Sequence, residues 1–322
     1  MQPVFSWQKK ALPAASLPEW RAGLGTSETV AVVAGAFDLL QPGNLAAVRA
    51  ARQRAARVCV ILEPDDAARA HAGEGRPQNP LGIRAEMAAC LRGVDAVAAL
   101  SGADAPALLR GLRPFTWMRC AGRGETDTLS AALAAAANAV ADLPALPGCF
   151  TGDIHEAIRA GRTPIRAARL AVGPASAEDP APPHRGAELV TVNGCFDILH
   201  VGHLRFLSEA RALGGRLAVL INSDASVQRF KGASRPVFPQ EFRRTALLAL
   251  EPVDEVHVFD EDNPLALIAR LRPRVHAKGG TFIPERAQAE KTLVESWGGR
   301  AAFCPLTDGF STSDYIRRVL GG

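Results

Sequence analysis

Gly194-Cys-Phe-Asp-Ile-Leu-His-Val-Gly-His203 is the stretch that decides the fold of this chain. It follows an apolar run, Leu189 to Asn193, that is typical of a buried strand, and an amphipathic helix pattern begins at Gly202. A strand, a glycine-bearing turn and a helix start leave backbone N–H groups unpaired, and these groups and the helix dipole favour an anion. His200 and His203 can donate hydrogen bonds there to charge that develops on a phosphoryl group. Most histidines are solvated or belong to a core, so the interpretation depends on the residues that follow.

Further residues of the phosphate-binding type occur in order along the C-terminal half. They are Asn222-Ser-Asp-Ala-Ser226, Lys231-Gly-Ala-Ser-Arg-Pro236, Pro239, Arg243, Lys278-Gly-Gly280 and Gly309-Phe-Ser-Thr-Ser313. With the His-x-Gly-His box, the series resembles the nucleotidyltransferase (cytidylyltransferase-like) superfamily, and within it the domain that makes ADP-heptose from heptose 1-phosphate and ATP. The resemblance covers about residues 187–320. It implies transfer of AMP from ATP to D-glycero-β-D-manno-heptose 1-phosphate, with release of pyrophosphate, for lipopolysaccharide or another envelope polysaccharide.

The resemblance implies a role for each candidate residue. Nucleotidyl transfer depends mainly on positioning and charge neutralisation, so hydrogen-bond donors and cations at the phosphates matter most. The predicted catalytic residues are His200 and His203, on the α- and β-phosphates, and Lys231, on the substrate phosphate or the α-phosphate. The predicted nucleotide-binding residues are Gly194, Cys195, Phe196, Gly202, Lys278, Gly279, Gly280, Ser311, Thr312 and Ser313. The predicted substrate-binding residues are Asp197, Asn222, Asp224, Arg235 and Arg243.

The N-terminal half repeats the C-terminal half at a constant offset, which places position 35 against position 194. Gly35-Ala-Phe-Asp-Leu-Leu-Gln-Pro-Gly-Asn44 aligns with Gly194 to His203, and the register continues without a gap as far as Leu112-Arg-Pro114. Such a register indicates two copies of one fold. The other matches are Arg76-Pro77 with Arg235-Pro236, Pro80 with Pro239, Arg84 with Arg243, Val94-Asp95 with Val253-Asp254, and Leu112-Arg-Pro114 with Leu271-Arg-Pro273.

The two copies differ where the chemistry is predicted. Turn and packing residues such as Gly35 and Phe37 are kept, whereas the N-terminal copy lacks the groups that would carry positive charge. That copy is therefore predicted to be catalytically inactive, with a scaffold or a dimer surface as its simplest role and a regulatory nucleotide pocket as the alternative. The replacements are Gln41 for His200, Asn44 for His203, Ala72 for Lys231, and Arg119-Cys-Ala121 for Lys278-Gly-Gly280.

Several candidate residues also have a structural interpretation. Arg235, Arg243 and Asp197 have identical partners in the inactive copy, which favours partly structural duty such as pairing with a carboxylate. The hydroxyl residues from Ser311 to Ser313 precede the last helix, where they could cap its first turn, bind the triphosphate, or do both. Lys231 could be a solvated surface lysine, but its loss from the inactive copy favours a function.

Strand-like and helical patterns alternate, which predicts an α/β fold of two tandem Rossmann-like domains, each a parallel sheet with helices on both faces. The predicted domains are 1–165 and 188–322, joined by a Pro/Ala-rich linker at 166–187. Ligands sit beyond the carboxyl ends of parallel strands, so the loops after Asn193, Asn222 and Lys278 should open at one edge. In the C-terminal copy we expect strands at 189–193, 216–222, 255–259, 275–278 and 301–304, with helices at 202–213, 240–250, 264–271 and from 313.

The composition of the chain limits which partners and which cellular location are expected. The net charge of +4 suits anionic substrates, but no Lys/Arg stripe with interleaved aromatics is present and the chain has one Tyr, which disfavours nucleic acid. The six scattered cysteines, with no Cys-x-x-Cys pair, predict reduced thiols in the cytoplasm rather than disulfides or zinc. The start of the chain has no signal-peptide core, and the alanine-rich run from Leu129 to Leu143 is too short to span a bilayer.

ATP and a phosphorylated sugar are the predicted partners. A triphosphate needs its charge neutralised, so Mg2+ is expected to arrive with the nucleotide, and no cluster of metal-ligand residues is predicted. Related bifunctional enzymes carry a sugar kinase before the transferase; residues 1–160 resemble no kinase, so a separate one is expected. A homodimer is compatible with the sequence. Thr281 departs from the acidic residue that the heptose enzymes usually carry after Lys-Gly-Gly, which leaves acceptor specificity open.

Two other functions remain open at this point. A cytidylyltransferase acting on glycerol 3-phosphate or phosphoethanolamine would use the same His-x-Gly-His box, although the run from Lys231 to Pro236 and the Gly309 to Ser313 segment favour the heptose branch. A nucleotide-binding regulatory protein is the alternative from another class. The intact His200, His203 and Lys231 disfavour it, and detectable turnover would exclude it.

Overall fold

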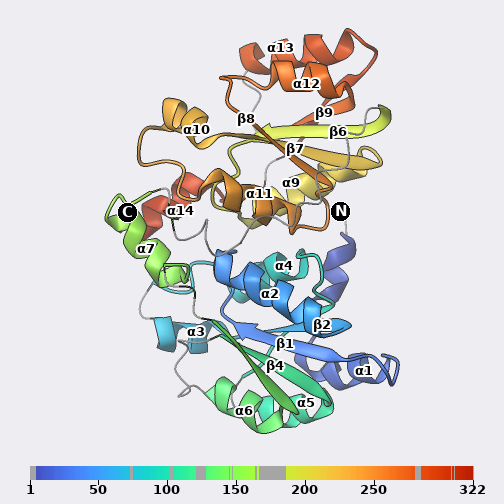
Figure 1. The fold of residues 1–322 in the computed structure, drawn as a ribbon, viewed down its shortest axis with the longest axis vertical. Coiled ribbons are helices and arrows are strands. Elements are labelled where there is room, and N and C mark those ends of the chain that lie inside the picture. Colours follow the sequence, from blue (N-terminus) through green and yellow to red (C-terminus); the bar gives the residue numbers. More distant parts are fainter. Residues whose placement is uncertain are drawn as a thin grey trace. The chain divides into compact units, whose positions relative to one another are not determined.

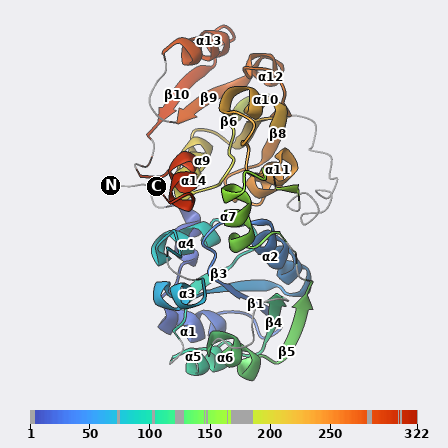
Figure 2. The ribbon, with the colours of Figure 1, turned by 90° about the vertical axis from the view of Figure 1, so that its left-hand side faces the viewer.

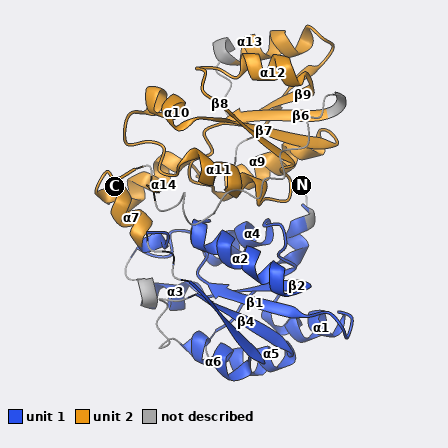
Figure 3. Cartoon of the chain, viewed as in Figure 1, with its two compact units in different colours: residues 1–152 blue, residues 153–322 orange. Residues whose placement is uncertain are grey.

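The computed structural model divides the chain into two compact units, Met1–Gly152 and Asp153–Gly322 (Figure 3). Helix α7 (Thr151–Arg159) packs from Asp153 onward with the second unit, so this division lies before the predicted boundary at residue 165. Most of the predicted linker, residues 167–185, lies outside the described part of the chain. The structure describes residues 5–72, 75–101, 104–120, 128–144, 146, 148–163, 165, 166, 186–279, 284–305, 307 and 309–321.

Each unit contains a five-stranded parallel sheet with the same strand order. In unit 1 the order is β3-β2-β1-β4-β5, and in unit 2 it is β10-β9-β6-β7-β8, so the first strand of each copy is central. This arrangement confirms the predicted fold class. The strands of unit 1 are β1 (Val30–Gly35), β2 (Arg57–Leu62), β3 (Ala96–Ala99), β4 (Phe115–Cys120) and β5 (Ala139–Leu143). Those of unit 2 are β6 (Gly186–Gly194), β7 (Arg216–Asn222), β8 (Glu255–Phe259), β9 (Pro273–Gly279) and β10 (Arg300–Cys304).

Helices cover both faces of each sheet, as Figures 1 and 2 show. In unit 1, α2 (Pro42–Arg54) and α4 (Leu81–Ala89) lie on one face, and α1 (Leu17–Ala22), α5 (Ala105–Gly111) and α6 (Thr128–Ala136) lie on the other. In unit 2, α9 (Val201–Ala212) and α11 (Gln240–Leu248) lie on one face, and α12 (Leu265–Leu271) and α13 (Pro284–Glu295) lie on the other. The remaining helices are η1 (Ser6–Lys10), η2 (Ala14–Ser16), α3 (Asp65–Ala72), α10 (Asp224–Lys231) and α14 (Thr312–Val319).

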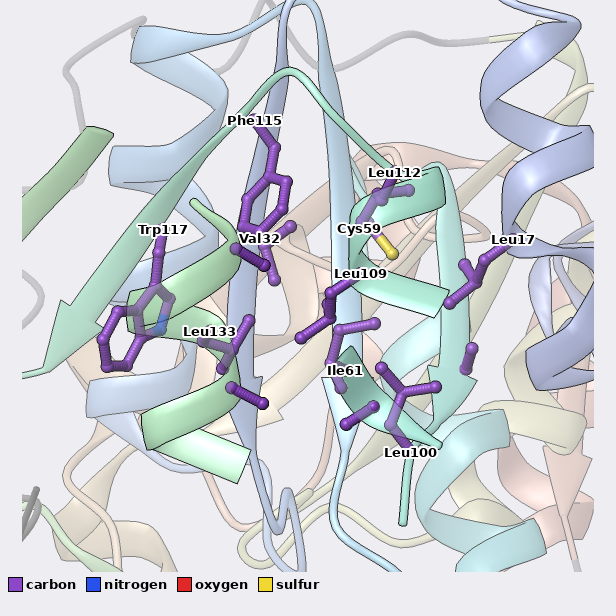
Figure 4. Packing of buried hydrophobic residues seen from close by; sticks show 14 of the residues in the cluster. Leu17, Val32, Cys59, Ile61, Leu100, Leu109, Leu112, Phe115, Trp117 and Leu133 are labelled. Atoms are coloured by element: carbon purple, nitrogen blue, oxygen red, sulfur yellow. The ribbon is translucent and has the colours of Figure 1, made fainter. Parts of the chain in front are cut away.

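Burial on both faces explains why the central strands are continuous apolar runs rather than alternating ones. Every residue from Leu217 to Ile221 in β7 is fully buried. In unit 1, Phe115 and Trp117 of β4 pack with Leu109 and Leu133 of the covering helices (Figure 4). The sheets are therefore rigid platforms, and their loops can hold a site.

Two helices within the sheet-bearing part of unit 2, α10 and α13, were absent from the sequence-based prediction. α10 begins directly after β7 because Ser223 caps it, its Oγ accepting a hydrogen bond from the Ser226 N–H. α13 is rich in charged residues and has little apolar periodicity, so its pattern resembles a loop until its packing against β9 and β10 is seen. Both helices contribute residues to the site described below.

Candidate active site

The predicted loops meet at one edge of the sheet of unit 2. β6 pairs in parallel with β7 on one side and with β9 on the other, so the carboxyl ends of the three strands are neighbours. The loops after Asn193, Asn222 and Lys278 therefore open at the same edge, as predicted.

The turn between β6 and α9 requires its glycines. Phe196 adopts a positive φ of 44°, and its ring lies under the turn, 5.1 Å from the His203 ring between centroids. A Cβ on Gly194 would lie 3.0 Å from Cε2 of Phe196. A Cβ on Gly202 would lie 3.1 Å from Nδ1 of His200. Any larger residue at either position would displace a ring that shapes the turn.

The two histidines stack at the start of α9. The centroids of the His200 and His203 rings are 3.7 Å apart and their planes are inclined by 25°. His200 is the N-cap residue, but its side chain makes no capping hydrogen bond. Neither imidazole has a hydrogen-bond partner among the described residues, and both Nδ1 atoms are buried. Two rings without partners at a helix N-terminus leave hydrogen-bonding capacity for an anion.

Burial keeps both histidines neutral. It lowers the pKa of His200 to about 4, although the carboxylate of Asp314 acts in the opposite direction. Burial lowers the pKa of His203 well below its ordinary value, and repulsion from a protonated His200 and from Lys231 would lower it further. At neutral pH both rings are therefore hydrogen-bond donors without charge. An anion bound beside them would favour the protonated form and raise both pKa values.

These depressed pKa values predict that the protein loses stability in mild acid. Between the ordinary histidine pKa of 6.5 and the native value of about 4, the unfolded chain binds a proton that native His200 does not. The free energy of unfolding should therefore fall as the pH decreases, by up to about 1.4 kcal/mol per pH unit for each such histidine. Urea unfolding at pH 7.5 and 5.5 measures this slope. His200→Gln with His203→Asn, the pair found in the inactive copy, should flatten it, and an unchanged slope would contradict the assignment.

The corresponding turn of unit 1 is closed by its own side chain. Oε1 of Gln41 accepts a hydrogen bond of 2.6 Å from the N–H of Gly43, so the helix start is already capped. In unit 2 the residue at this place, His200, leaves the helix start free. A cavity of about 120 Å³ lies against Gln41 and Phe37, and its lining includes the neutral side chain of Asn44. The regulatory-pocket alternative for this copy stays a prediction.

The N-terminus of α14 lies beside the histidine turn. Oγ of Ser311 accepts a hydrogen bond of 3.0 Å from the N–H of Asp314, so the predicted capping role is confirmed for this residue. Oγ1 of Thr312 donates to the carbonyl of Ile198, within the turn itself. Ser313 is exposed. A second helix start thus faces the same place, and binding of a triphosphate tail by these residues stays a prediction.

Lys231 and Arg235 flank the turn from the other side. Lys231 is exposed at the end of α10, close enough for its charge to lower the pKa of His203. Nε of Arg235 donates to Oδ2 of Asp197 at 2.8 Å, while its Nη2 is buried and has no partner among the described residues. One guanidinium nitrogen therefore remains for a ligand, and the predicted contact of Arg235 with the substrate stays a prediction.

Asp197 holds the loop that carries Arg235. Its carboxylate accepts hydrogen bonds from the N–H groups of Val237 and Phe238, at 2.9 and 3.0 Å. Asp38 of unit 1 accepts the same two bonds from Gln78 and Asn79. Asp197 is thus a loop-positioning residue in this structure, and its predicted contact with the substrate stays a prediction.

Arg243 and Asp224 are likewise scaffold residues in this structure. The Arg243 side chain is fully buried, and it donates to the carbonyls of Cys195 and Asn222 at 2.7 and 2.8 Å and to Oδ1 of Asp224 at 2.9 Å. Such a side chain ties together the loops after β6 and β7 and cannot reach a substrate. Arg243 therefore positions these loops, whereas the side chain of Asp224 is partly exposed and its predicted substrate contact stays a prediction. Unit 1 has the same set, in which Arg84 donates to Ala36, Glu63 and Asp65.

The side chains of Asn222 and Cys195 line the space between those loops. Nδ2 of Asn222 donates to Oγ of Ser226 at 3.0 Å, and Sγ of Cys195 lies 3.8 Å from its Oδ1. The side-chain atoms in these two contacts are all uncharged. Both residues are at the predicted edge, and their contact with a ligand stays a prediction.

Lys278 ends in a buried polar network. Its Nζ lies 2.6 Å from Oε2 of Glu290 and donates to Oδ1 of Asn193 at 2.9 Å. Glu290 also lies 3.4 Å from Nε2 of His276, whose Nδ1 is 2.8 Å from Oγ1 of Thr191. The nearby Lys278 and His276 hold the pKa of Glu290 below its ordinary value against the opposing effect of burial, so the carboxylate is charged. Gly279 closes β9, and Gly280 and Thr281 lie outside the described residues.

Comparison with known proteins identifies this part of the chain. Residues 191–318 match the Cytidylyltransferase-like family model. The C-terminal half therefore contains a segment that resembles a cytidylyltransferase-like domain. Bifunctional protein HldE of Syntrophotalea carbinolica is 51% identical over 136 residues, and that of Geotalea uraniireducens is 50% identical over 138 residues. These matches confirm the predicted resemblance.

The matches cover a limited share of each protein. They span 42% and 43% of this chain, and the chain covers 28% of the length of either relative. A solved structure, the lipopolysaccharide core biosynthesis protein from Thermoplasma volcanium, is 23% identical with a TM-score of 0.33, over 38% of this chain and 98% of its own.

Glu290 and His276 were missed by the sequence-based reasoning, although the repeat contained a signal. The inactive copy has Val32 where the cytidylyltransferase-like domain has Thr191, and Trp117 where it has His276. A buried polar network costs free energy unless every group is paired, so stability alone does not explain it. Its restriction to the copy with the histidine pair indicates a role in the site.

The part of the chain that the structure describes contains neither a group of metal ligands nor a helix that could span a membrane. No three His, Cys, Asp or Glu side chains there could hold a metal ion together. None of the helices described combines the length and apolar character that a membrane span needs. All six cysteines are free thiols in this structure.

Proposed function

We propose that the C-terminal unit is an adenylyltransferase that transfers AMP from ATP to D-glycero-β-D-manno-heptose 1-phosphate. The products are ADP-heptose and pyrophosphate, for lipopolysaccharide or another envelope polysaccharide. The observation that carries this proposal is the His200–His203 pair, stacked and without partners at the start of α9. The HldE relatives, which are 51% and 50% identical over 136 and 138 residues, and the ordered series of motifs support the heptose branch.

The reaction joins a phosphate oxygen of the sugar to the α-phosphorus of ATP and breaks the bond between the α-phosphorus and the bridging oxygen. Pyrophosphate leaves with that electron pair. In this proposal His200 and His203 donate to the phosphate oxygens as charge develops, and the uncapped start of α9, with the N-terminus of α14 beside it, holds the triphosphate. Lys231 and the free Nη2 of Arg235 bind the phosphate of the acceptor.

Mg2+ enters this proposal with the nucleotide rather than through a site of the protein. The described residues contain no group of three ligands for a metal ion, which fits an ion held mainly by phosphate oxygens. Its chemistry is neutralisation of the triphosphate charge. Lys231 and the histidines then act on the oxygens that the ion leaves free.

The wider setting is also proposed. A separate sugar kinase supplies the heptose 1-phosphate, and the reaction takes place in the cytoplasm, where free thiols such as the six found here persist. The N-terminal unit, whose helix start is capped by Gln41, is proposed to be catalytically inactive. A homodimer remains compatible with these features.

The test measures pyrophosphate release with Mg2+, crossing ATP and CTP against heptose 1-phosphate, glycerol 3-phosphate and phosphoethanolamine. Release with ATP and heptose 1-phosphate alone is expected. Release with CTP and an alcohol phosphate would move the protein to the cytidylyltransferase alternative. Nucleotide binding without turnover across the panel would instead favour the regulatory alternative.

The buried network predicts an effect of Glu290→Gln on nucleotide binding. The neutral amide keeps the size of the side chain but no longer holds the Lys278 ammonium, which is 2.6 Å from the carboxylate. Loss of one charge-assisted contact is expected to raise the KM for ATP about tenfold, with kcat changed much less. Steady-state kinetics measure both constants. Glu295→Gln, an exposed change on the same helix, is the control, and equal KM values for the two variants would contradict the role of Glu290.

A further inference from the structure

The described residues of 153–166, here called the clasp, connect the end of the N-terminal repeat to the cytidylyltransferase-like domain. In the repeat, this segment belongs to the inactive copy, and it precedes residue 191, where the family match begins. In the structure it nevertheless belongs to unit 2. Ile154 and Ile165 are buried there, so the clasp is an integral part of that unit.

The first arm of the clasp holds α14. Nε2 of His155 lies 2.8 Å from the hydroxyl of Tyr315, and their rings meet edge to face with centroids 5.8 Å apart. Both side chains are buried, at 1% and 4% exposure. One turn further along, Nε of Arg159 donates to the carbonyl of Val319 at 3.0 Å. The N–H of Tyr315 donates to the carbonyl of Ser311, so this arm fixes the helix whose first turn faces the histidines.

The second arm holds the loop that follows Lys231. The N–H of Ile165 donates to the carbonyl of Val237 at 2.8 Å, and the hydroxyl of Thr163 donates to the carbonyl of Ser234. The same loop carries Arg235. One short segment thus contacts two parts of the site that are about eighty residues apart in the chain.

We infer that the clasp positions the N-terminus of α14 and the Lys231–Val237 loop for the triphosphate and the acceptor phosphate. His155 is then a positioning residue that acts through Tyr315. The inference rests on the proposed function, and it gives the inactive copy a task, because its last helix supports the active site. A buried histidine paired with a buried hydroxyl satisfies two polar groups that would otherwise be costly, so the contact is specific.

The test uses four single variants and one double variant of the full chain. His155→Phe and Tyr315→Phe each keep a ring but remove the hydrogen bond between the two side chains, and the double variant measures whether their effects are coupled through this bond. His155→Gln restores a nitrogen near the position of Nε2. Glu156→Ala, on the exposed side of the same helix, is the control. Two readouts are compared: the kinetic constants for ATP, and hydrogen exchange of the amides in 311–316 and 232–238.

Each phenylalanine variant is expected to raise the KM for ATP about fivefold with little change in kcat, as for loss of one neutral hydrogen bond. Exchange should become faster in 311–316, the double variant should match the single ones, and His155→Gln should return towards the wild type. Unchanged exchange, or faster exchange with an unchanged KM, would overturn the inference. If the wild type shows no turnover, the proposed function fails, and exchange alone still decides whether the clasp holds α14.

Discussion

His203→Ala is expected to lower kcat about 100- to 1,000-fold while the protein stays folded. The ring stacks on His200 with 3.7 Å between centroids and has no hydrogen-bond partner among the described residues, so its removal leaves no protein group unpaired. The loss is one of transition-state stabilisation. Removal of a single donor aimed at developing phosphoryl charge is worth this order of magnitude in other enzymes. Pyrophosphate release at saturating substrate concentrations measures kcat. Circular dichroism and thermal unfolding show whether the variant stays folded.

The repeat provides a matched control for this variant. Asn44→Ala changes the equivalent position of unit 1, where the neighbouring Gln41 already caps the helix start, and it should leave kcat unaltered. His203→Asn places the residue of the inactive copy in the active one and should be nearly as slow as His203→Ala, because an amide cannot take up a proton. Turnover of His203→Ala within about fivefold of the wild type would remove His203 from the catalytic set.

The sequence predicted the layers of the fold and the edge where the site lies. The apolar runs at Leu189 to Asn193 and Arg216 to Asn222 are strands, and parallel pairing brings their ends together as expected. The repeat also indicated which of the arginines shared by both copies have a structural role. Arg84 and Arg243 are identical in both copies because both tie the same loops together, and this identity was the sign of structural duty.

Other features of the site depend on contacts that no local pattern contains. The depressed pKa of His200 follows from its burial in the folded structure, and the carboxylate that opposes this shift, Asp314, is more than a hundred residues away in the chain. Glu290 was missed because α13 has little apolar periodicity, so nothing local placed its carboxylate beside Lys278. The packing of the clasp with unit 2 was not predicted, since the register of the repeat records the ancestry of a segment and not the unit on which it packs.

Arg243→Ala is expected to lower the free energy of unfolding of unit 2 by about 3 kcal/mol or more. The change leaves the Asp224 carboxylate without its guanidinium and two buried carbonyls, those of Asn222 and Phe238, without a donor. Breaking a buried ion pair on one side costs about 3–5 kcal/mol, and each unsatisfied buried group adds to that. Arg243→Lys keeps the charge but lacks the planar fork, so it should recover less than half of the loss. Urea titration followed by hydrogen exchange assigns the change to a unit.

The equivalent variant in unit 1 separates scaffold from chemistry. Arg84 makes the same bonds to Ala36, Glu63 and Asp65, so Arg84→Ala should destabilise unit 1 by a similar amount. Under conditions where both units remain folded, Arg243→Ala should also reduce kcat, because the loops after β6 and β7 lose their common anchor, whereas Arg84→Ala should not. If Arg243→Ala and the wild type had the same free energy of unfolding, these bonds would make no net contribution to stability. A fall in kcat with Arg84→Ala would show instead that unit 1 itself takes part in turnover.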